Sequence, residues 1–130
     1  MKPKVLCVCA KGINRSRYLA HYLREKGYET RWGGVEPQLW FGKDITLYTK
    51  KEDIDWADVI VIVRPRLKTI LEGKFPLDGK NVIVFDITDN PDIIVKTHPE
   101  LEGQPKKVFN EKITYPALRN AIDPYLPLEK

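Results

Sequence analysis

Apolar residues fall into short runs along this chain, and each run predicts a β-strand. Residues 5–9 are continuously apolar, the pattern of a strand that is buried on both faces of a sheet. Residues 59–63 and 81–87 predict two further strands of the same kind. Residues 28–35 predict a shorter strand that ends in the flexible pair Gly33-Gly34. The chain is therefore expected to form four strands.

Helical patterns lie between these runs. Residues 16–26 carry an apolar stripe at helical spacing, and Gly27 follows as a natural C-cap. Residues 53–58 predict a helical turn that leads into the third strand. Residues 65–72 predict a helix that begins with a proline and is stopped by Gly73.

Two segments show no sustained period. Residues 37–50 are irregular, and residues 90–105 contain prolines that predict a loop with at most a short helix. Asn110 is placed to cap a last helix that runs toward Ile122, with Pro116 as a kink or a late start.

The alternation of strands and helices predicts a parallel sheet with right-handed crossovers. The expected fold class is α/β: a compact four-stranded parallel sheet with helices on both faces, forming a single domain over residues 1–130. Ligands of such folds bind beyond the carboxyl ends of the strands. Cys9, Arg64 and Asp89 each follow a strand end and are expected there.

Composition narrows the class of protein. Hydrophobic residues make up 42% and charged residues 31%, which is typical of a soluble globular protein. Without a long apolar stretch or a signal-peptide pattern, the sequence predicts a cytoplasmic protein with no membrane partner. The net charge of +4 suggests a nucleic-acid partner, but the basic residues are scattered among acidic ones. We therefore predict no nucleic-acid partner and favour an anionic substrate.

The cysteines point to nucleophilic chemistry rather than to a disulfide or a metal. Cys7 and Cys9 are too few and too close for a disulfide-stapled fold. His21 and His98 have no zinc-ligand spacing to them, so neither a metal nor another cofactor is predicted. Cys7 is expected to pack in the core.

The loop between the first strand and the first helix carries the candidate chemistry. Backbone N–H groups in such a loop, with the free donors of a helix N-terminus, make a cradle for a phosphate-sized oxyanion. Gly12 can take the positive φ that a tight cradle requires, and Arg15 offers paired donors to two phosphoryl oxygens. The predicted phosphate-binding loop consists of Ala10, Lys11, Gly12, Ile13, Asn14, Arg15 and Ser16.

Cys9 lies at the base of that predicted cradle. The same donors would stabilise its thiolate, so that Cys9 attacks phosphorus while Arg15 holds the phosphoryl oxygens. Ser16 can donate a hydrogen bond to the sulfur and ease its departure from a phosphocysteine. Buried structural cysteines are common, and the spacing Cys-x5-Arg is weak alone. Its place between a buried strand and a helix favours the catalytic interpretation.

At these residues the chain resembles the low-molecular-weight protein tyrosine phosphatases, as a divergent prokaryotic member. The resemblance rests on VLCVCAKGINRS near the N-terminus and on the later stretches RWGGV, WADVIVIV and FDITD. It implies that Cys9 is the nucleophile, Arg15 the phosphate clamp and Ser16 the thiolate partner. It also selects Asp89 as the general acid, ahead of the neighbouring Asp86 and Asp92.

The loop departs from the pattern of that family. The family usually has Gly and Asn where this chain has Lys11 and Gly12. It often has a second cysteine at the position of Asn14, and usually a proline at that of Arg17.

The sequence therefore predicts a hydrolase of the protein tyrosine phosphatase type that acts through a phosphocysteine intermediate. The expected substrates are aryl phosphates: a phosphorylated small molecule or a phosphotyrosine protein. Trp40 is either an apolar wall that stacks a phenyl leaving group or a cover for an edge of the core.

The same residues allow alternative functions. The atypical Lys11-Gly12 pair suggests a catalytically weak module that binds phosphate or phosphopeptide. A phosphocysteine carrier has a similar layout, but Arg15 and Asp89 favour hydrolysis. Arsenate reduction needs a further cysteine after Cys9, and the chain has none. The sequence leaves the oligomeric state open.

Overall fold

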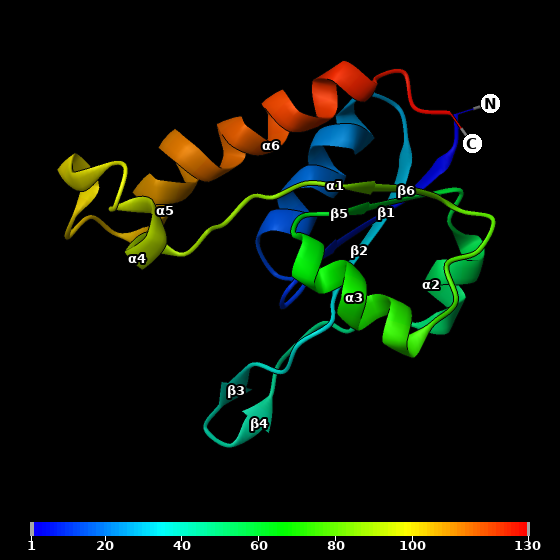
Figure 1. Ribbon diagram of the computed structural model, residues 1–130, viewed down its shortest axis with the longest axis horizontal. Coiled ribbons are helices and arrows are strands. Elements are labelled where there is room, and N and C mark those ends of the chain that lie inside the picture. The colour runs from blue at the N-terminus through cyan, green and yellow to red at the C-terminus, as the bar shows by residue number, and fades with distance from the viewer. Residues whose placement is uncertain (1, 130) are drawn as a thin grey trace.

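A four-stranded parallel sheet forms the centre of the molecule (Figure 1). A computed structural model describes residues 2–129. The strands, in the spatial order β2-β1-β5-β6, are β1 (Lys4–Cys9), β2 (Glu29–Gly34), β5 (Val59–Ile62) and β6 (Asn81–Val84). β1 pairs with β2 and β5, and its last residue lies opposite the end of β2. The predicted four-stranded α/β fold is confirmed.

Helices cover both faces of the sheet (Figure 1). The longer ones are α1 (Arg15–Glu25), α2 (Lys51–Trp56), α3 (Pro65–Lys74) and α6 (Tyr115–Ile122). α1 and α6 pack together on one face, and α2 and α3 lie on the other. The short helical elements are α4 (Pro91–Ile94), η1 (Pro99–Leu101), α5 (Lys106–Phe109), η2 (Asn110–Thr114) and η3 (Asp123–Tyr125). No helix within residues 2–129 is long and apolar enough to span a membrane.

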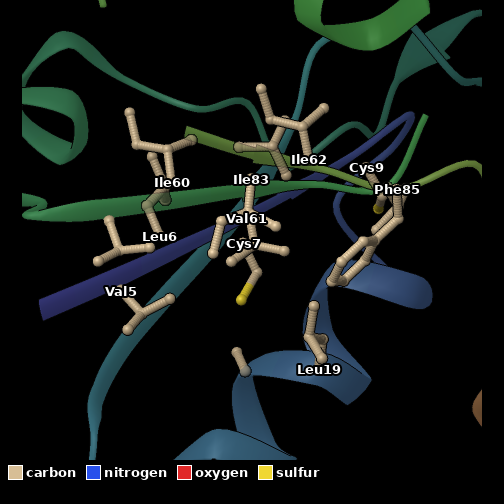
Figure 2. Packing of buried hydrophobic residues seen from close by; sticks show 14 of the residues in the cluster. Val5, Leu6, Cys7, Cys9, Leu19, Ile60, Val61, Ile62, Ile83 and Phe85 are labelled. Carbon is tan, nitrogen blue, oxygen red and sulfur yellow. The ribbon is translucent and has the colours of Figure 1, made fainter. Parts of the chain in front are cut away.

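The core forms around the two central strands. β5 is buried along its whole length, and β1 is buried from Val5 onward, as their continuous apolar sequences predict. Figure 2 shows Cys7 pointing to the side of α1, where Leu19 lies, while Ile60 and Ile62 point to the opposite side. Cys7 is fully buried, which confirms its expected place in the core and raises the pKa of its thiol.

Several predicted boundaries are wrong for identifiable reasons. Gly73 does not stop the third helix, because α3 passes through it and ends where Phe75 turns extended, at φ −141°. The last strand ends at Val84 because its partner ends at Ile62, although the N–H of Ile87 still bonds to the carbonyl of Val63. The irregular segment contains a short hairpin, formed by β3 (Leu39–Trp40) and β4 (Lys43–Asp44), which projects from the body of the molecule (Figure 1).

The last helical segment begins earlier than predicted and changes its winding. Asn110 is not an N-cap: its φ of −63° and ψ of −50° are helical, and α5 precedes it. The N–H of Tyr115 bonds to the carbonyl of Asn110, five residues back, which marks η2 as a π-helical turn. Pro116 has no N–H, and its ring clashes with the carbonyl four residues earlier in a regular α-helix. The wider turn directly before Pro116 relieves that clash.

Residues between α4 and α5 form a unit with its own small core. Ile94, Leu101 and Phe109 are buried against one another, separately from the main cluster. The chain reaches this unit along an extended stretch that leaves β6 and contains Asp89 (Figure 1).

Candidate active site

Cys9 is the last residue of β1 and lies at the start of the loop that joins β1 to α1. Its side chain is 2% exposed, and its Sγ lies 3.0 Å from Oγ of the buried Ser16. The backbone N–H of Gly12 donates a second hydrogen bond to Sγ, at 3.2 Å. Two hydrogen-bonding groups, the Ser16 hydroxyl and the Gly12 N–H, thus converge on the sulfur. We call residues 9–15 the Cys9 loop.

Two carbonyl groups of the Cys9 loop accept hydrogen bonds from neighbouring segments of the backbone. The carbonyl of Ala10 accepts the N–H groups of Val35 and Glu36, each at 2.9 Å. The carbonyl of Lys11 accepts the N–H of Leu47 at 3.2 Å. Because these oxygens point toward the end of β2 and the segment after the hairpin, they do not repel an anion in the loop.

Two glycines allow the close approach between the Cys9 loop and the backbone segments that bond to it. Gly12 has φ +76°, and a Cβ on it would lie 2.5 Å from the carbonyl oxygen of Leu47. A Cβ on Gly34 would lie 2.4 Å from the carbonyl carbon of Lys11 and 2.6 Å from the nitrogen of Gly12. The predicted flexibility of the pair Gly33-Gly34 is therefore wrong: both residues are buried in β2, and Gly34 packs against the Cys9 loop.

Arg15 begins α1 and reaches across to the stretch that follows β6. It is 6% exposed, and its NH1 donates to the carbonyl of Ile87 at 2.6 Å. Its Nε lies 3.5 Å from Asp89 Oδ1 and has no hydrogen-bond partner among the described residues. A buried guanidinium N–H without a partner suits an oxyanion that binds beside it.

Asp89 is the aspartate that the structure brings to the cavity. Its Oδ2 accepts a hydrogen bond from Asn14 Nδ2 at 2.6 Å and lies 3.5 Å from Lys106 Nζ. Burial raises the pKa of Asp89, but Arg15, Asn14 and Lys106 together hold it below its ordinary value. The carboxylate is therefore ionised when no substrate is bound. Asp86, by contrast, is 74% exposed and pairs with Arg64.

A cavity of about 560 Å³ opens above Cys9. Its walls include Arg15 and Asp89, and also Ile13, Lys106 and Asn110. The Cys9 loop thus supplies one side of the cavity, and the segment from Asp89 to Asn110 supplies the other.

Trp40 lies outside the cavity. It is 61% exposed on the projecting hairpin and packs edge-on against Phe41, with ring centroids 5.1 Å apart. The residue of this segment that lines the cavity is Gln38. Phe41 and Gly42 have φ values of +48° and +79° and form the tight turn that joins β3 to β4 at the tip of the hairpin. With this exposure, Trp40 does not cover an edge of the core.

Six site residues were missed from the sequence. Five of them line the cavity: Gln38, Asn90, Pro91, Lys106 and Asn110. The sixth, Tyr115, bonds to Asn14 from α6. Asn110 is a polar residue beside a predicted helix, and that position favours an N-cap over a place in the cavity wall. Within residues 2–129, no three or more His, Cys, Asp or Glu side chains are grouped so that they could hold a metal ion.

Three solved structures with a similar fold are named as phosphatases. The YwlE arginine phosphatase from Geobacillus stearothermophilus is 21% identical, with a TM-score of 0.65 over 93% of this chain and 88% of that chain. The low-molecular-weight protein tyrosine phosphatase of T. tengcongensis is 20% identical, with a TM-score of 0.61 over 92% and 95%. The corresponding enzyme of Streptococcus pyogenes, SP-PTP, is 14% identical, with a TM-score of 0.66 over 100% and 95%.

Comparisons at the sequence level give no match. No protein-family model matches the chain. No curated protein matches it either. The likeness to the solved structures therefore concerns the fold, and it agrees with the resemblance stated from the sequence. The chain has the fold of the low-molecular-weight protein tyrosine phosphatases, as a divergent example of it.

Proposed function

We propose that the chain is a cysteine-dependent phosphomonoester hydrolase that acts on aryl phosphates. The observation that carries the proposal is the position of Cys9 Sγ, which lies at the cavity floor between the Ser16 hydroxyl and the Gly12 N–H. Arg15 and Asp89 stand on the walls of the same cavity, as a phosphate clamp and a proton donor need to do.

Substrate binding would rearrange the pair formed by Arg15 and Asp89. Arg15 turns its donors to the phosphoryl oxygens, which match the planar guanidinium. Asp89 then loses a cationic partner and gains an anionic neighbour, and both changes raise its pKa. The carboxyl group therefore takes up a proton when substrate arrives, which is when an acid is needed.

The reaction then has two displacements at phosphorus. Cys9 Sγ forms a P–S bond while the P–O bond to the leaving group breaks, and Asp89 gives its proton to the departing oxygen. A water molecule next attacks phosphorus and gives its proton to the Asp89 carboxylate. The P–S bond breaks, and the hydrogen bond from Ser16 stabilises the thiolate that leaves.

The aryl preference that we propose draws on the hairpin beside the cavity. Trp40 and Phe41 lie on the hairpin that continues from Gln38, so they would contact an aromatic substrate that extends beyond the cavity. Trp40→Ala should therefore raise KM for a phosphotyrosine peptide more than for a small aryl phosphate. One similar structure is named an arginine phosphatase, so phosphoarginine belongs in the same substrate panel.

The decisive experiment is hydrolysis of 4-nitrophenyl phosphate in the presence of a chelator. We expect turnover that Cys9→Ser abolishes and that Cys7→Ala largely keeps, because Cys7 is buried in the core. Iodoacetate should label Cys9, and inorganic phosphate should protect it. A phosphate-binding module or a phosphocysteine carrier would show the protection without turnover. Equal loss in both cysteine variants would contradict the assignment of Cys9.

A further inference from the structure

We propose that Asn14 is a positioning residue for the acid Asp89: its amide occupies Oδ2 of the carboxyl group and leaves Oδ1 to carry the proton. The inference rests on the proposed function and adds a role for a residue of the Cys9 loop beyond holding phosphate. It also explains why Tyr115, which lies outside the cavity lining, contacts that loop.

The hydrogen bonds of Asn14 determine the orientation of its amide. The Nδ2 atom of Asn14 donates to Asp89 Oδ2 at 2.6 Å and to Asn110 Oδ1 at 3.2 Å. The Oδ1 atom of Asn14 lies 2.7 Å from the hydroxyl of Tyr115. An ionised carboxylate only accepts hydrogen bonds, so the NH₂ group must face Asp89. The amide oxygen must then face Tyr115, which donates its hydroxyl proton.

The π-helical turn brings the two helical partners of Asn14 to one side. Residues five apart lie roughly 140° apart around a regular α-helix. In η2 the hydrogen bond from the Tyr115 N–H to the Asn110 carbonyl closes a wider turn, so these two residues lie about one turn apart. Both side chains therefore reach Asn14. The ring of Tyr115 also stacks on Tyr18, at 3.9 Å between centroids and 3° between planes.

The two oxygens of Asp89 have different surroundings. Oδ2 faces the N–H groups of Asn14 and, at 3.5 Å, the ammonium of Lys106. Oδ1 faces Arg15 Nε at 3.5 Å, without a hydrogen bond. A neutral carboxyl group places its proton on the oxygen that meets the fewer donors. When Arg15 turns to a bound phosphoryl group, that oxygen is Oδ1, on the side of the phosphate.

The charged and titratable groups around Asp89 come from three helices. Arg15 belongs to α1, Lys106 to α5, and the titratable hydroxyl of Tyr115 to α6. Burial, and then the charge of Asp89, raises the pKa of Tyr115. Tyr115 therefore stays protonated and remains a donor to Asn14 across the range in which Asp89 titrates.

The test compares Asn14→Ala and Tyr115→Phe on two substrates. Phenyl phosphate has a basic leaving group that needs a proton, and 4-nitrophenyl phosphate has an acidic one that needs it less. We expect kcat/KM to fall at least about tenfold for phenyl phosphate and less than about threefold for 4-nitrophenyl phosphate. Tyr115→Phe removes one hydroxyl and leaves the Cys9 loop intact, so it carries the test if Asn14→Ala perturbs that loop.

The background of Asp89→Asn gives a second readout. Without the acid, a residue that acts through it has nothing left to position, so adding Asn14→Ala or Tyr115→Phe should cost little more. Tyr22→Phe is the matched control. It removes a hydroxyl between α1 and the C-terminal segment, where Tyr22 donates to Asp123 at 2.7 Å, away from the cavity. It should leave both substrates unaffected.

The outcomes separate this inference from the proposed function. A loss of equal size on both substrates in Asn14→Ala and Tyr115→Phe, or losses that add fully to that of Asp89→Asn, would overturn the positioning role while hydrolysis by Cys9 stands. A chain that hydrolyses neither substrate would overturn the proposed function and this inference with it.

Discussion

The two segments that form the cavity both leave the sheet at the carboxyl ends of its parallel strands, yet they are held in different ways. The Cys9 loop follows β1, a central strand, and backbone hydrogen bonds from residues 35, 36 and 47 hold it. The second segment, from Asp89 to Asn110, is reached through residues 85–88, which follow the edge strand β6. From Ile87 onward, the chain is held to the Cys9 loop mainly by the side chains of Arg15 and Asn14.

This difference suits the two chemical roles that we propose. A nucleophile must stay at the cavity floor, and Cys9 is 2% exposed in a loop whose backbone is bonded on one side. An acid must meet leaving groups of different shape. The side chain of Asp89 is 19% exposed, and it is held by polar side chains that can change their hydrogen-bond partners. Substitutions can break the backbone contacts and the side-chain contacts separately.

The largest effect is expected from Gly34→Ala. The new Cβ would lie 2.4 Å from the carbonyl carbon of Lys11, and backbone on both sides cannot yield as a flexible side chain would. We expect the free energy of unfolding to fall by about 3 kcal/mol or more, and phosphatase turnover to be lost, because the Cys9 loop must shift. Urea unfolding and hydrolysis of 4-nitrophenyl phosphate measure the two effects.

The control for that variant is Gly73→Ala. Gly73 lies in α3, with open space around the position of a Cβ. Alanine there should stabilise the protein by roughly 0.5–1 kcal/mol, because glycine is the poorer helix former. A Gly34→Ala protein as stable as the unsubstituted chain would show that the close approach between β2 and the Cys9 loop is not required.

The second-largest effect is expected from Arg15→Lys, because Arg15 links the two segments of the cavity wall. Lysine keeps the positive charge but loses the planar pair of donors, and with it the bond to the Ile87 carbonyl. We expect kcat/KM for aryl phosphates to fall by about 100-fold or more. Arg17→Lys, two residues along α1 and outside the cavity lining, should keep nearly full activity. Near-normal turnover in Arg15→Lys would contradict the paired-donor role.

The sequence predicted what depends on neighbours along the chain. Cys9, Arg15 and Ser16 lie within one strand, loop and helix, so local pattern was enough to bring them together. Asp89 was predicted because the carboxyl ends of parallel strands share one edge. These residues meet in the structure as expected, and their catalytic roles stay predictions.

What the sequence could not predict depends on contacts between distant segments. The flexibility predicted for the pair Gly33-Gly34 is wrong because both packing partners lie elsewhere in the chain: Thr49 beside Gly33, and the Cys9 loop beside Gly34. Lys106 and Asn110 reach the cavity only because the unit before α6 folds on its own small core. The π-helical turn forms where the ring of Pro116 would clash with a regular α-helix. The spacing of apolar residues does not show how the backbone relieves that clash.

The smallest effect concerns the stability that the ionised Asp89 provides when no phosphate is present. Its pKa in the folded protein lies below the ordinary value, so ionisation favours the folded state above about pH 4. That contribution is lost as the pH falls through the folded pKa. Asp89→Asn should therefore lower the free energy of unfolding at pH 7 by less than about 1 kcal/mol.

The same difference should shrink as the pH falls below about 4, because the carboxyl group of the unsubstituted chain is then neutral as well. Urea unfolding of both proteins between pH 3 and pH 7 measures it, with Asp92→Asn, outside the cavity, as the control. Inorganic phosphate sharpens the comparison. If it draws Arg15 away from Asp89, the carboxylate loses its main partner, and Asp89→Asn should bind phosphate at least as tightly as the unsubstituted chain. A stability difference that grows toward low pH would mean that the neutral carboxyl group, and not its charge, holds the second segment in place.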